Sequence, residues 1–192
     1  MSTCCVNTEN EVTVRNLQTA FQSELDAHEN YIAFAVRADA ECAFEAASLF
    51  RALGRSEKIH ADNHARVIRR LGGKPDSKIH TVEVKTTLDN LMTALEEEVY
   101  VIDLMYPRFL ADNGGADNSA ARTFSWALEA EKSHACLLSE MITQMKRGQL
   151  MASRGIALEF YVRPVCGYVL RSSEPERCWS CEHFCKTFEI VR

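Results

Sequence analysis

The sequence has no run of about 18 consecutive apolar residues, which is the length that a helix needs to cross a lipid bilayer. It also has no excess of basic residues, because 22 Lys and Arg face 27 Asp and Glu and the formal net charge is −5. Nucleic acids and anionic membranes bind dense basic surfaces, so we exclude both as partners. The first ten residues show neither the basic nor the apolar stretch of a secretory signal, and we expect a cytoplasmic protein.

Proline is scarce in most of the chain, since Pro75 and Pro107 are the only prolines between residues 13 and 147. Apolar residues there follow the 3.6-residue period of an amphipathic helix over four long stretches. The second stretch ends at Gly72-Gly73, and the connection 72–85 is long enough to run from one end of a bundle to the other. This pattern predicts an all-α, ferritin-like four-helix bundle over residues 12–150, after a disordered segment 1–11.

The composition changes after Gly148, where glycines and prolines separate short β-prone runs such as 160–162 and 167–170. We predict a small separate unit over residues 156–192. A unit this short buries too little apolar surface to fold without a metal or disulfides. Four of the eight cysteines lie in it, which indicates a metal-binding knuckle: Cys166, Cys178, Cys181 and Cys185. We expect Cys42 and Cys136, which stand alone in helical stretches, to be small buried residues.

An internal repeat gives the strongest functional signal in the chain. Residues 50–61 match residues 124–135, and the same offset relates the helices that precede them. Each half has one Glu on the apolar face of its first helix and a Glu-x-x-His pair on the apolar face of its second. The offset relates Glu24 to Glu98, Glu57 to Glu131, and His60 to His134.

Four carboxylates at one level of a bundle would repel one another unless cations compensate their charge. Two divalent ions bring four positive charges, and two neutral imidazoles complete a ligand set that suits iron or manganese. A single Glu-x-x-His pair is common on solvated helices, but two copies at one offset predict a dinuclear site in which Glu57 and Glu131 bridge. We interpret His28 and His64, one turn away on the same faces, as neighbours of the site and not as ligands.

The motifs around these residues match one known family. They are Glu57-Lys-x-His60-Ala, Met105-Tyr106-Pro107-x-Phe, Glu131-Lys-x-His134, Pro164-Val165-Cys166-Gly167-Tyr168 and Cys178-x-x-Cys181. With them the chain resembles a rubrerythrin, a di-iron bundle followed by a rubredoxin-like domain. The resemblance implies that hydrogen bonds from Tyr31 and Tyr106 support catalysis at a di-iron centre whose ligands are Glu24, Glu57, His60, Glu98, Glu131 and His134. It also implies reduction of hydrogen peroxide or oxygen in oxidative-stress defence, a rubredoxin- or flavoprotein-like electron donor, and a homodimer.

One departure from the family pattern concerns the bundle. The resemblance implies a further Glu one turn after Glu98, and this sequence has Val101 there. The remaining six ligands are the set of bacterioferritin-like sites. Two alternatives to peroxide reduction therefore stay open: ferroxidase-type iron oxidation, and an iron or redox sensor without turnover.

A second departure concerns the tail, where Arg163 replaces the first Cys of the expected Cys-x-x-Cys. A guanidinium group is always cationic and has no lone pair to give to a metal. Cys185 or His183 then becomes the candidate fourth ligand, because both lie within ligand spacing of Cys181. An iron site, a structural zinc site and a metal-free remnant all remain open for this unit.

Overall fold

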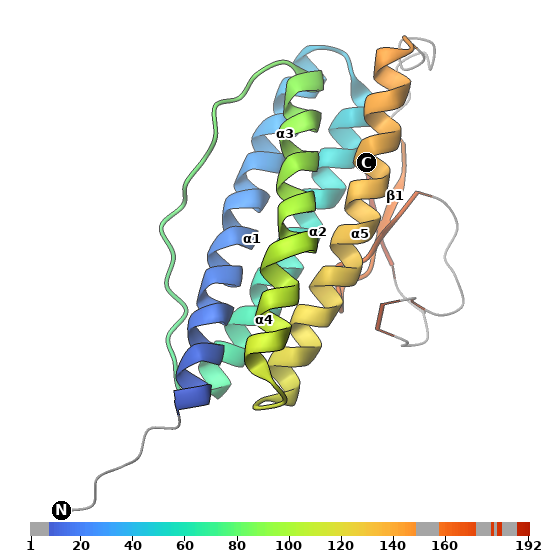
Figure 1. Cartoon of the computed structure of the whole chain (residues 1–192). Coiled ribbons are helices and arrows are strands. Elements are labelled where there is room, and N and C mark those ends of the chain that lie inside the picture. Colours follow the sequence, from blue (N-terminus) through green and yellow to red (C-terminus); the bar gives the residue numbers. More distant parts are fainter. Residues whose placement is uncertain (1–7, 149–157, 172–177, 179, 182–187) are drawn as a thin grey trace, which may run out of the picture.

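The computed structural model of the chain describes residues 8–148, 158–171, 178, 180–181 and 188–192. Its helices lie side by side in a bundle (Figure 1) and are α1 (Thr8–Ala40), α2 (Phe44–Arg70), α3 (Thr87–Tyr100), η1 (Val101–Met105), α4 (Tyr106–Asn113) and α5 (Asn118–Lys146). Because α3, η1 and α4 follow one another as a single rod, the predicted four-helix bundle with a long crossover is confirmed. Within the described ranges, no helix combines the length and the apolar character needed to cross a membrane.

The first helix begins earlier than the sequence predicted. α1 starts at Thr8, so residues 8–11 are helical and their assignment to a disordered segment was wrong. Acidic residues near a helix N-terminus interact favourably with the positive end of the helix dipole, and Glu11 lies in this stretch. Residues 1–7, which include Cys4 and Cys5, lie outside the described residues.

The connection between α2 and α3 runs along the length of α1 (Figure 1). Four polar side chains, one helical turn apart on α1, hydrogen-bond to backbone groups at alternate residues of this crossover. The pairs are Gln18 with Asp76, Gln22 with Lys78, Asp26 with His80, and Asn30 with Val82. Four helical residues rise roughly 6 Å and two extended residues roughly 6.6 Å, so the two registers match. The side chains of α1 therefore hold the crossover extended.

The rod formed by α3 and α4 widens at η1, a π-helical turn. The Tyr106 amide donates to the carbonyl of Val101, five residues earlier. Pro107 follows in the first turn of α4, and because it has no amide hydrogen it cannot donate the usual helical bond. The extra residue in the turn leaves Met105, Tyr106 and Phe109 on the buried side.

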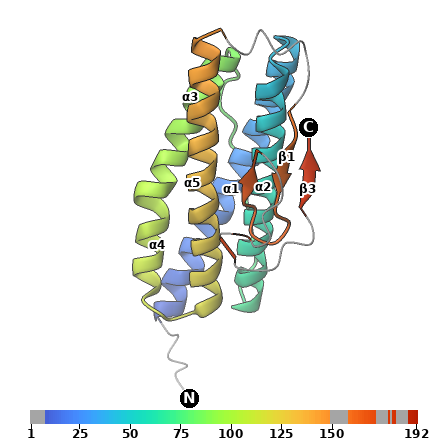
Figure 2. The ribbon, with the colours of Figure 1, turned by 90° about the vertical axis from the view of Figure 1, so that its right-hand side faces the viewer.

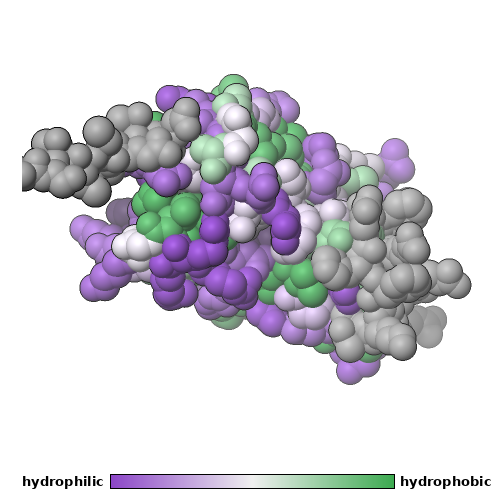
Figure 3. Space-filling view, turned by 90° about the horizontal axis from the view of Figure 1, so that it is seen from below, coloured by the Kyte–Doolittle hydropathy of each residue, from purple (hydrophilic) through white to green (hydrophobic). Residues whose placement is uncertain are grey.

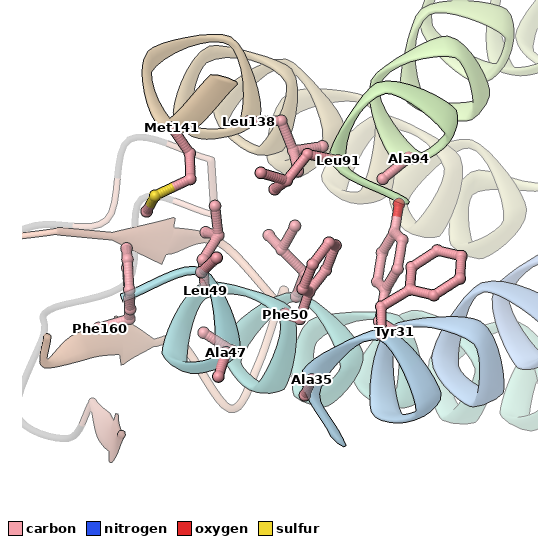
Figure 4. Packing of buried hydrophobic residues seen from close by; sticks show 14 of the residues in the cluster. Tyr31, Ala35, Ala47, Leu49, Phe50, Leu91, Ala94, Leu138, Met141 and Phe160 are labelled. Atoms are coloured by element: carbon pink, nitrogen blue, oxygen red, sulfur yellow. The ribbon is translucent and has the colours of Figure 1, made fainter. Parts of the chain in front are cut away.

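Two apolar clusters fill the bundle, one toward each end. The first includes Tyr31, Phe50, Leu91 and Leu138, which are labelled in Figure 4. The second includes Leu17, Ile68, Tyr106, Phe109 and Phe124. Glu24, Glu98, Glu131 and His134 each fall between the residues of these two clusters along their helices, and on α2 Glu57 and His60 lie next to Ile59, the last residue of the first cluster there. Hydrophilic side chains form most of the described surface at the end where α1 begins (Figure 3).

The C-terminal residues form a small sheet against the side of α2 (Figure 2). Its strands pair antiparallel in the order β2-β1-β3 and are β1 (Phe160–Val162), β2 (Val169–Leu170) and β3 (Glu189–Val191). Phe160 belongs to the same apolar cluster as Leu49 and Met141 of the bundle (Figure 4). Arg55 on α2 forms a two-point ion pair with Glu189, at 2.6 and 2.8 Å. The sheet is thus docked on the bundle by apolar and charged contacts.

Two cysteines expected in the core lie on the surface. Cys42 and Cys136 are both exposed, so that prediction was wrong. Cys42 occupies the tight turn between α1 and α2, with a φ of 58°. Cys136 lies on the outer face of α5, where its Sγ atom is 3.9 Å from Glu140 Oε1. Amphipathic periodicity marks a buried face without fixing which residues at its edges remain accessible.

Candidate metal centre

The bundle brings together all six side chains that the repeat singled out. Each is at most 4% exposed. Their atoms form two groups in which one ligand atom from each residue lies within 4.8 Å of the others: Glu24, Glu57, His60 and Glu131, and then Glu57, Glu98, Glu131 and His134. Glu57 and Glu131 are the two residues that belong to both groups.

Both histidines turn the same ring nitrogen toward the carboxylates. His60 Nδ1 lies 2.9 Å from Glu57 Oε2 and 3.0 Å from Glu131 Oε1. His134 Nδ1 lies 2.7 Å from Glu131 Oε2 and 3.2 Å from Glu57 Oε1. On the far side of its ring, His60 Nε2 is 3.0 Å from the Cys166 carbonyl oxygen, which accepts its proton and leaves Nδ1 as the free donor atom for a metal.

Several atoms of this cluster have no hydrogen-bond partner within the described part of the chain. They are Glu57 Oε1, both carboxylate oxygens of Glu131, and both ring nitrogens of His134. His134 Nδ1 is close to Glu131, but the contact lacks hydrogen-bond geometry. A buried carboxylate without partners is strongly destabilising. The orphaned oxygens of Glu57 and Glu131 and the Nδ1 atom of His134 lie within the cluster, so the donor set fits a pair of divalent ions.

The electrostatics of the cluster also favour bound cations. Burial, together with the negative charge of Glu131, raises the pKa of Glu98 to about 8. For Glu24, burial is outweighed by the hydrogen bond and charge of His60, and its pKa falls to about 2. Burial lowers the pKa of His60 and His134, but the surrounding carboxylates prevail and raise both. Without a metal the cluster thus draws protons onto its imidazoles.

Two tyrosines hold the carboxylates at the ends of the cluster. The Tyr31 hydroxyl donates to Glu98 Oε1 at 2.7 Å, and the Tyr106 hydroxyl donates to Glu24 Oε1. Burial, together with the nearby carboxylates, raises the pKa of both hydroxyls. Both tyrosines therefore remain protonated donors to the carboxylates.

His64 lies beside the cluster, with its Nε2 atom 3.9 Å from Glu24 Oε1, and neither His64 nor His28 belongs to the two groups of ligand atoms. His64 lies between two hydroxyl groups, with Nε2 3.1 Å from the Tyr106 hydroxyl and Nδ1 3.1 Å from Thr123 Oγ1. Burial lowers the pKa of His64 to about 4, so its ring is neutral. His28 Nδ1 is 2.7 Å from the Gly54 carbonyl oxygen. The role of Thr123 had no signal in the sequence, because it depends on the packing of α5 against α2.

A cavity of about 510 Å³ reaches the centre from the side of α1, α3 and the crossover. The four carboxylates of the centre belong to its lining, as does Val101. Nearer the surface the lining includes the exposed Glu96 and His80 and the half-buried Glu97. Small molecules and ions can therefore reach the centre along an acidic wall.

Three of the four predicted cysteines meet in the C-terminal unit. The Sγ atoms of Cys166, Cys178 and Cys181 lie within 4.8 Å of one another, and all three residues are buried. Cys185, the fourth predicted ligand, lies outside the described residues. Arg163 is buried, and its guanidinium carbon lies 5.8 Å from the centre of the Phe188 ring. The described thiols could hold a metal ion but supply one ligand fewer than a rubredoxin iron requires.

This cysteine knuckle packs directly onto the metal centre. Besides the contact of Cys166 with His60, Ser56 Oγ donates to the Gly167 carbonyl at 2.5 Å. Gly167 has a φ of 79°, and a Cβ atom there would lie 2.3 Å from His60 Nε2. Only glycine permits both the backbone conformation and the approach.

Comparisons with known proteins agree with this architecture. The family model described as Rubrerythrin matches residues 15–142. The curated protein "Rubrerythrin-2" of Clostridium acetobutylicum is 31% identical over 180 residues, which cover 92% of this chain and 95% of that protein. "Nigerythrin" of Nitratidesulfovibrio vulgaris is 28% identical over 177 residues, 88% of this chain and 81% of that one.

Solved structures show the same fold. A structure titled "Fully reduced state of nigerythrin (all ferrous)" superposes with a TM-score of 0.82 at 25% identity, covering 93% of this chain and 86% of that chain. A bacterioferritin of Desulfovibrio desulfuricans superposes with a TM-score of 0.71 at 23% identity, covering 78% and 91%. The bacterioferritin match shows a shared ferritin-like bundle fold and nothing more.

Proposed function

Because the chain belongs to the rubrerythrin family, whose members use a di-iron centre, we propose that it reduces hydrogen peroxide to water at the buried carboxylate cluster. The observation that carries this proposal is the pair of overlapping four-residue groups with their orphaned carboxylate oxygens. Glu57 and Glu131 would bridge the two ions. Glu24 and Glu98 would each bind one ion, and His60 and His134 would complete the two coordination shells through Nδ1.

When bound, two ferrous ions supply the two electrons that cleavage of one peroxide consumes. The four carboxylates balance the charge of two such ions, so the loaded centre is neutral and can stay buried. The hydroxyls of Tyr31 and Tyr106 keep Glu98 and Glu24 in place and offer protons beside the reacting oxygen atoms. The 510 Å³ cavity admits the oxidant while the apolar clusters exclude water from the other sides.

A second function, ferroxidase-type iron oxidation, is supported by Val101. This valine lines the cavity where the family resemblance implies a carboxylate, so the centre keeps only six ligands. The acidic side chains of Glu96 and Glu97 on the same wall would attract ferrous ions from solvent. In this reading iron is the substrate and oxygen the oxidant.

The metal-bound chain, reduced anaerobically and mixed with one equivalent of oxidant, separates these functions. Reoxidation that is faster with peroxide than with oxygen, and that repeats when reductant is added, supports peroxide reduction. Faster reaction with oxygen and continued consumption of added ferrous ions support ferroxidase activity. A single slow oxidation with either oxidant contradicts both and would favour an iron or redox sensor.

We also propose that the reducing electrons arrive from a separate rubredoxin- or flavoprotein-like donor. The contact between the Cys166 carbonyl and His60 supports the cysteine knuckle as their entry point. The chain would act as a homodimer, and the exposed Val99, Tyr100 and Leu104 of α3 and η1 offer apolar surface for the contact. Sedimentation at equilibrium tests this, and a monomeric mass at micromolar concentration would contradict it.

A further inference from the structure

A chain of hydrogen bonds leads from the centre to a second cavity, on the side of α2 and α5. This cavity has a volume of about 220 Å³, and Thr123 contributes to its lining. The other lining residues are mostly polar: Asn63, Arg66, Arg70, Ser119 and Arg122 belong to it, with Val67 and Trp126. A polar cavity of this size holds water. From it, the bonds pass through Thr123, His64 and Tyr106 to Glu24.

The direction of every bond in this chain follows from counting protons. Tyr106 has one hydroxyl proton and gives it to Glu24, so its oxygen can only accept from His64. His64 Nε2 must therefore carry a proton. A neutral imidazole has a single N–H, so Nδ1 is an acceptor and takes its bond from the Thr123 hydroxyl. All donors thus point inward, from the cavity toward Glu24.

We infer that Thr123 and His64 are positioning residues in a proton path that leads from the cavity on α2 and α5 through Tyr106 to Glu24. This inference rests on the proposed peroxide reduction. In that reaction one peroxide takes two electrons from the reduced metal pair and two protons, its O–O bond breaks, and two waters form. A hydronium ion in the cavity gives a proton to Thr123 and remains there as water. The Thr123 proton passes to His64 Nδ1, the His64 Nε2 proton to Tyr106 and the Tyr106 proton to Glu24, which gives one proton to a peroxide oxygen.

The other proton would enter on the opposite side of the centre. Tyr31 lines the 510 Å³ cavity and donates to Glu98, so it can pass on a proton from the side where the oxidant enters. The two tyrosines then deliver protons to the two ends of the cluster. Tyr106 receives its proton through the buried hydrogen bonds of His64 and Thr123, and Tyr31 receives its proton from the 510 Å³ cavity. His64 and Thr123 are 0% and 5% exposed, which keeps that chain free of competing water.

The substitution Thr123→Val tests the path, because it removes the hydroxyl group and keeps the shape of the side chain. We expect single-turnover reoxidation by peroxide to slow about tenfold, with a larger solvent deuterium isotope effect. Thr123→Ser keeps the hydroxyl and should restore the wild-type rate. The matched control is Thr13→Val, since Thr13 is also buried and its hydroxyl bonds to Asn113, away from the path. Equal rates for Thr123→Val and the wild type would overturn the inference.

A second measurement does not depend on activity. Nitrogen NMR of the His64 ring in the metal-free chain should show a protonated Nε2 and a hydrogen-bonded, unprotonated Nδ1. In Thr123→Val the Nδ1 signal should move to the position of a ring nitrogen without a donor. A proton on Nδ1 in the wild type would overturn the inward direction. If the wild-type chain does not react with peroxide, the proposed function fails, and the NMR result still decides whether the inward chain exists.

Discussion

The two tyrosines at the ends of the cluster give a paired test of the hydrogen-bond geometry. The Tyr31 hydroxyl makes one hydrogen bond within the described structure, to Glu98. The Tyr106 hydroxyl makes two, because it donates to Glu24 and accepts from His64. Both side chains are at most 1% exposed, so replacement by Phe removes the hydroxyl without changing apolar burial.

Each Phe variant loses a bond to a carboxyl group, and Tyr106→Phe also leaves the buried His64 N–H without an acceptor. An unsatisfied buried donor costs about 1 to 3 kcal/mol. Tyr106→Phe should therefore lower the free energy of unfolding by about 1 to 3 kcal/mol more than Tyr31→Phe. The assay is urea unfolding of the metal-free chain, monitored by the circular dichroism signal of its helices. Equal slopes of the unfolding free energy against urea concentration exclude effects on the denatured state. Equal losses, or a larger loss for Tyr31→Phe, would refute the hydrogen-bond assignment.

Three further predictions concern the site, the crossover and one helix terminus. Glu131→Gln should reduce bound iron below two ions per chain by metal analysis, whereas Glu129→Gln, on the exposed face of α5, should not. Asn30→Ala should cost about 1 kcal/mol of stability and speed limited proteolysis of the crossover, and unchanged cleavage would contradict its anchoring role. The pKa of Asp117 is lowered, because Arg70 and two helix amides outweigh the effect of its burial. The ionised Asp117 carboxylate therefore stabilises the folded chain above pH 3.8, its ordinary pKa, and this contribution is lost as the pH falls through the lower pKa of the folded state. Asp117→Asn should reduce the fall in unfolding free energy at acid pH, measured by urea unfolding at a series of pH values, and an unchanged fall would contradict this role of Asp117.

The sequence predicted the six residues of the centre because helical periodicity alone fixes which face they share. Once Glu57 and His60 lie on a buried face, a second copy at one offset can only meet them inside the bundle. The same reasoning could not predict the π-helical turn before Pro107, since one additional residue there does not disturb the apolar pattern on either side. Nor could it predict Thr123, whose partner on another helix is known only after the helices are packed.

The crossover shows a further limit of sequence reasoning. Its length predicted a connection from end to end of the bundle, and this is confirmed. Its path along α1 depends on side chains such as Gln22 and Asn30 that bond to its backbone. Polar residues four apart on a helix usually indicate a solvated face, so their spacing alone predicts no contact with the crossover. The match between their spacing and an extended chain can be seen only after the position of the crossover is known.

Iron content measured together with Mössbauer spectroscopy shows whether the bundle holds a bridged pair of iron ions. The full-length chain would be loaded with ferrous iron without oxygen and then oxidised with one equivalent of peroxide. We expect two iron ions per bundle that form one spin-coupled pair, because Glu57 and Glu131 are shared by both four-residue groups. Fewer than two ions in the bundle, or two ions without magnetic coupling, would contradict a bridged di-iron centre.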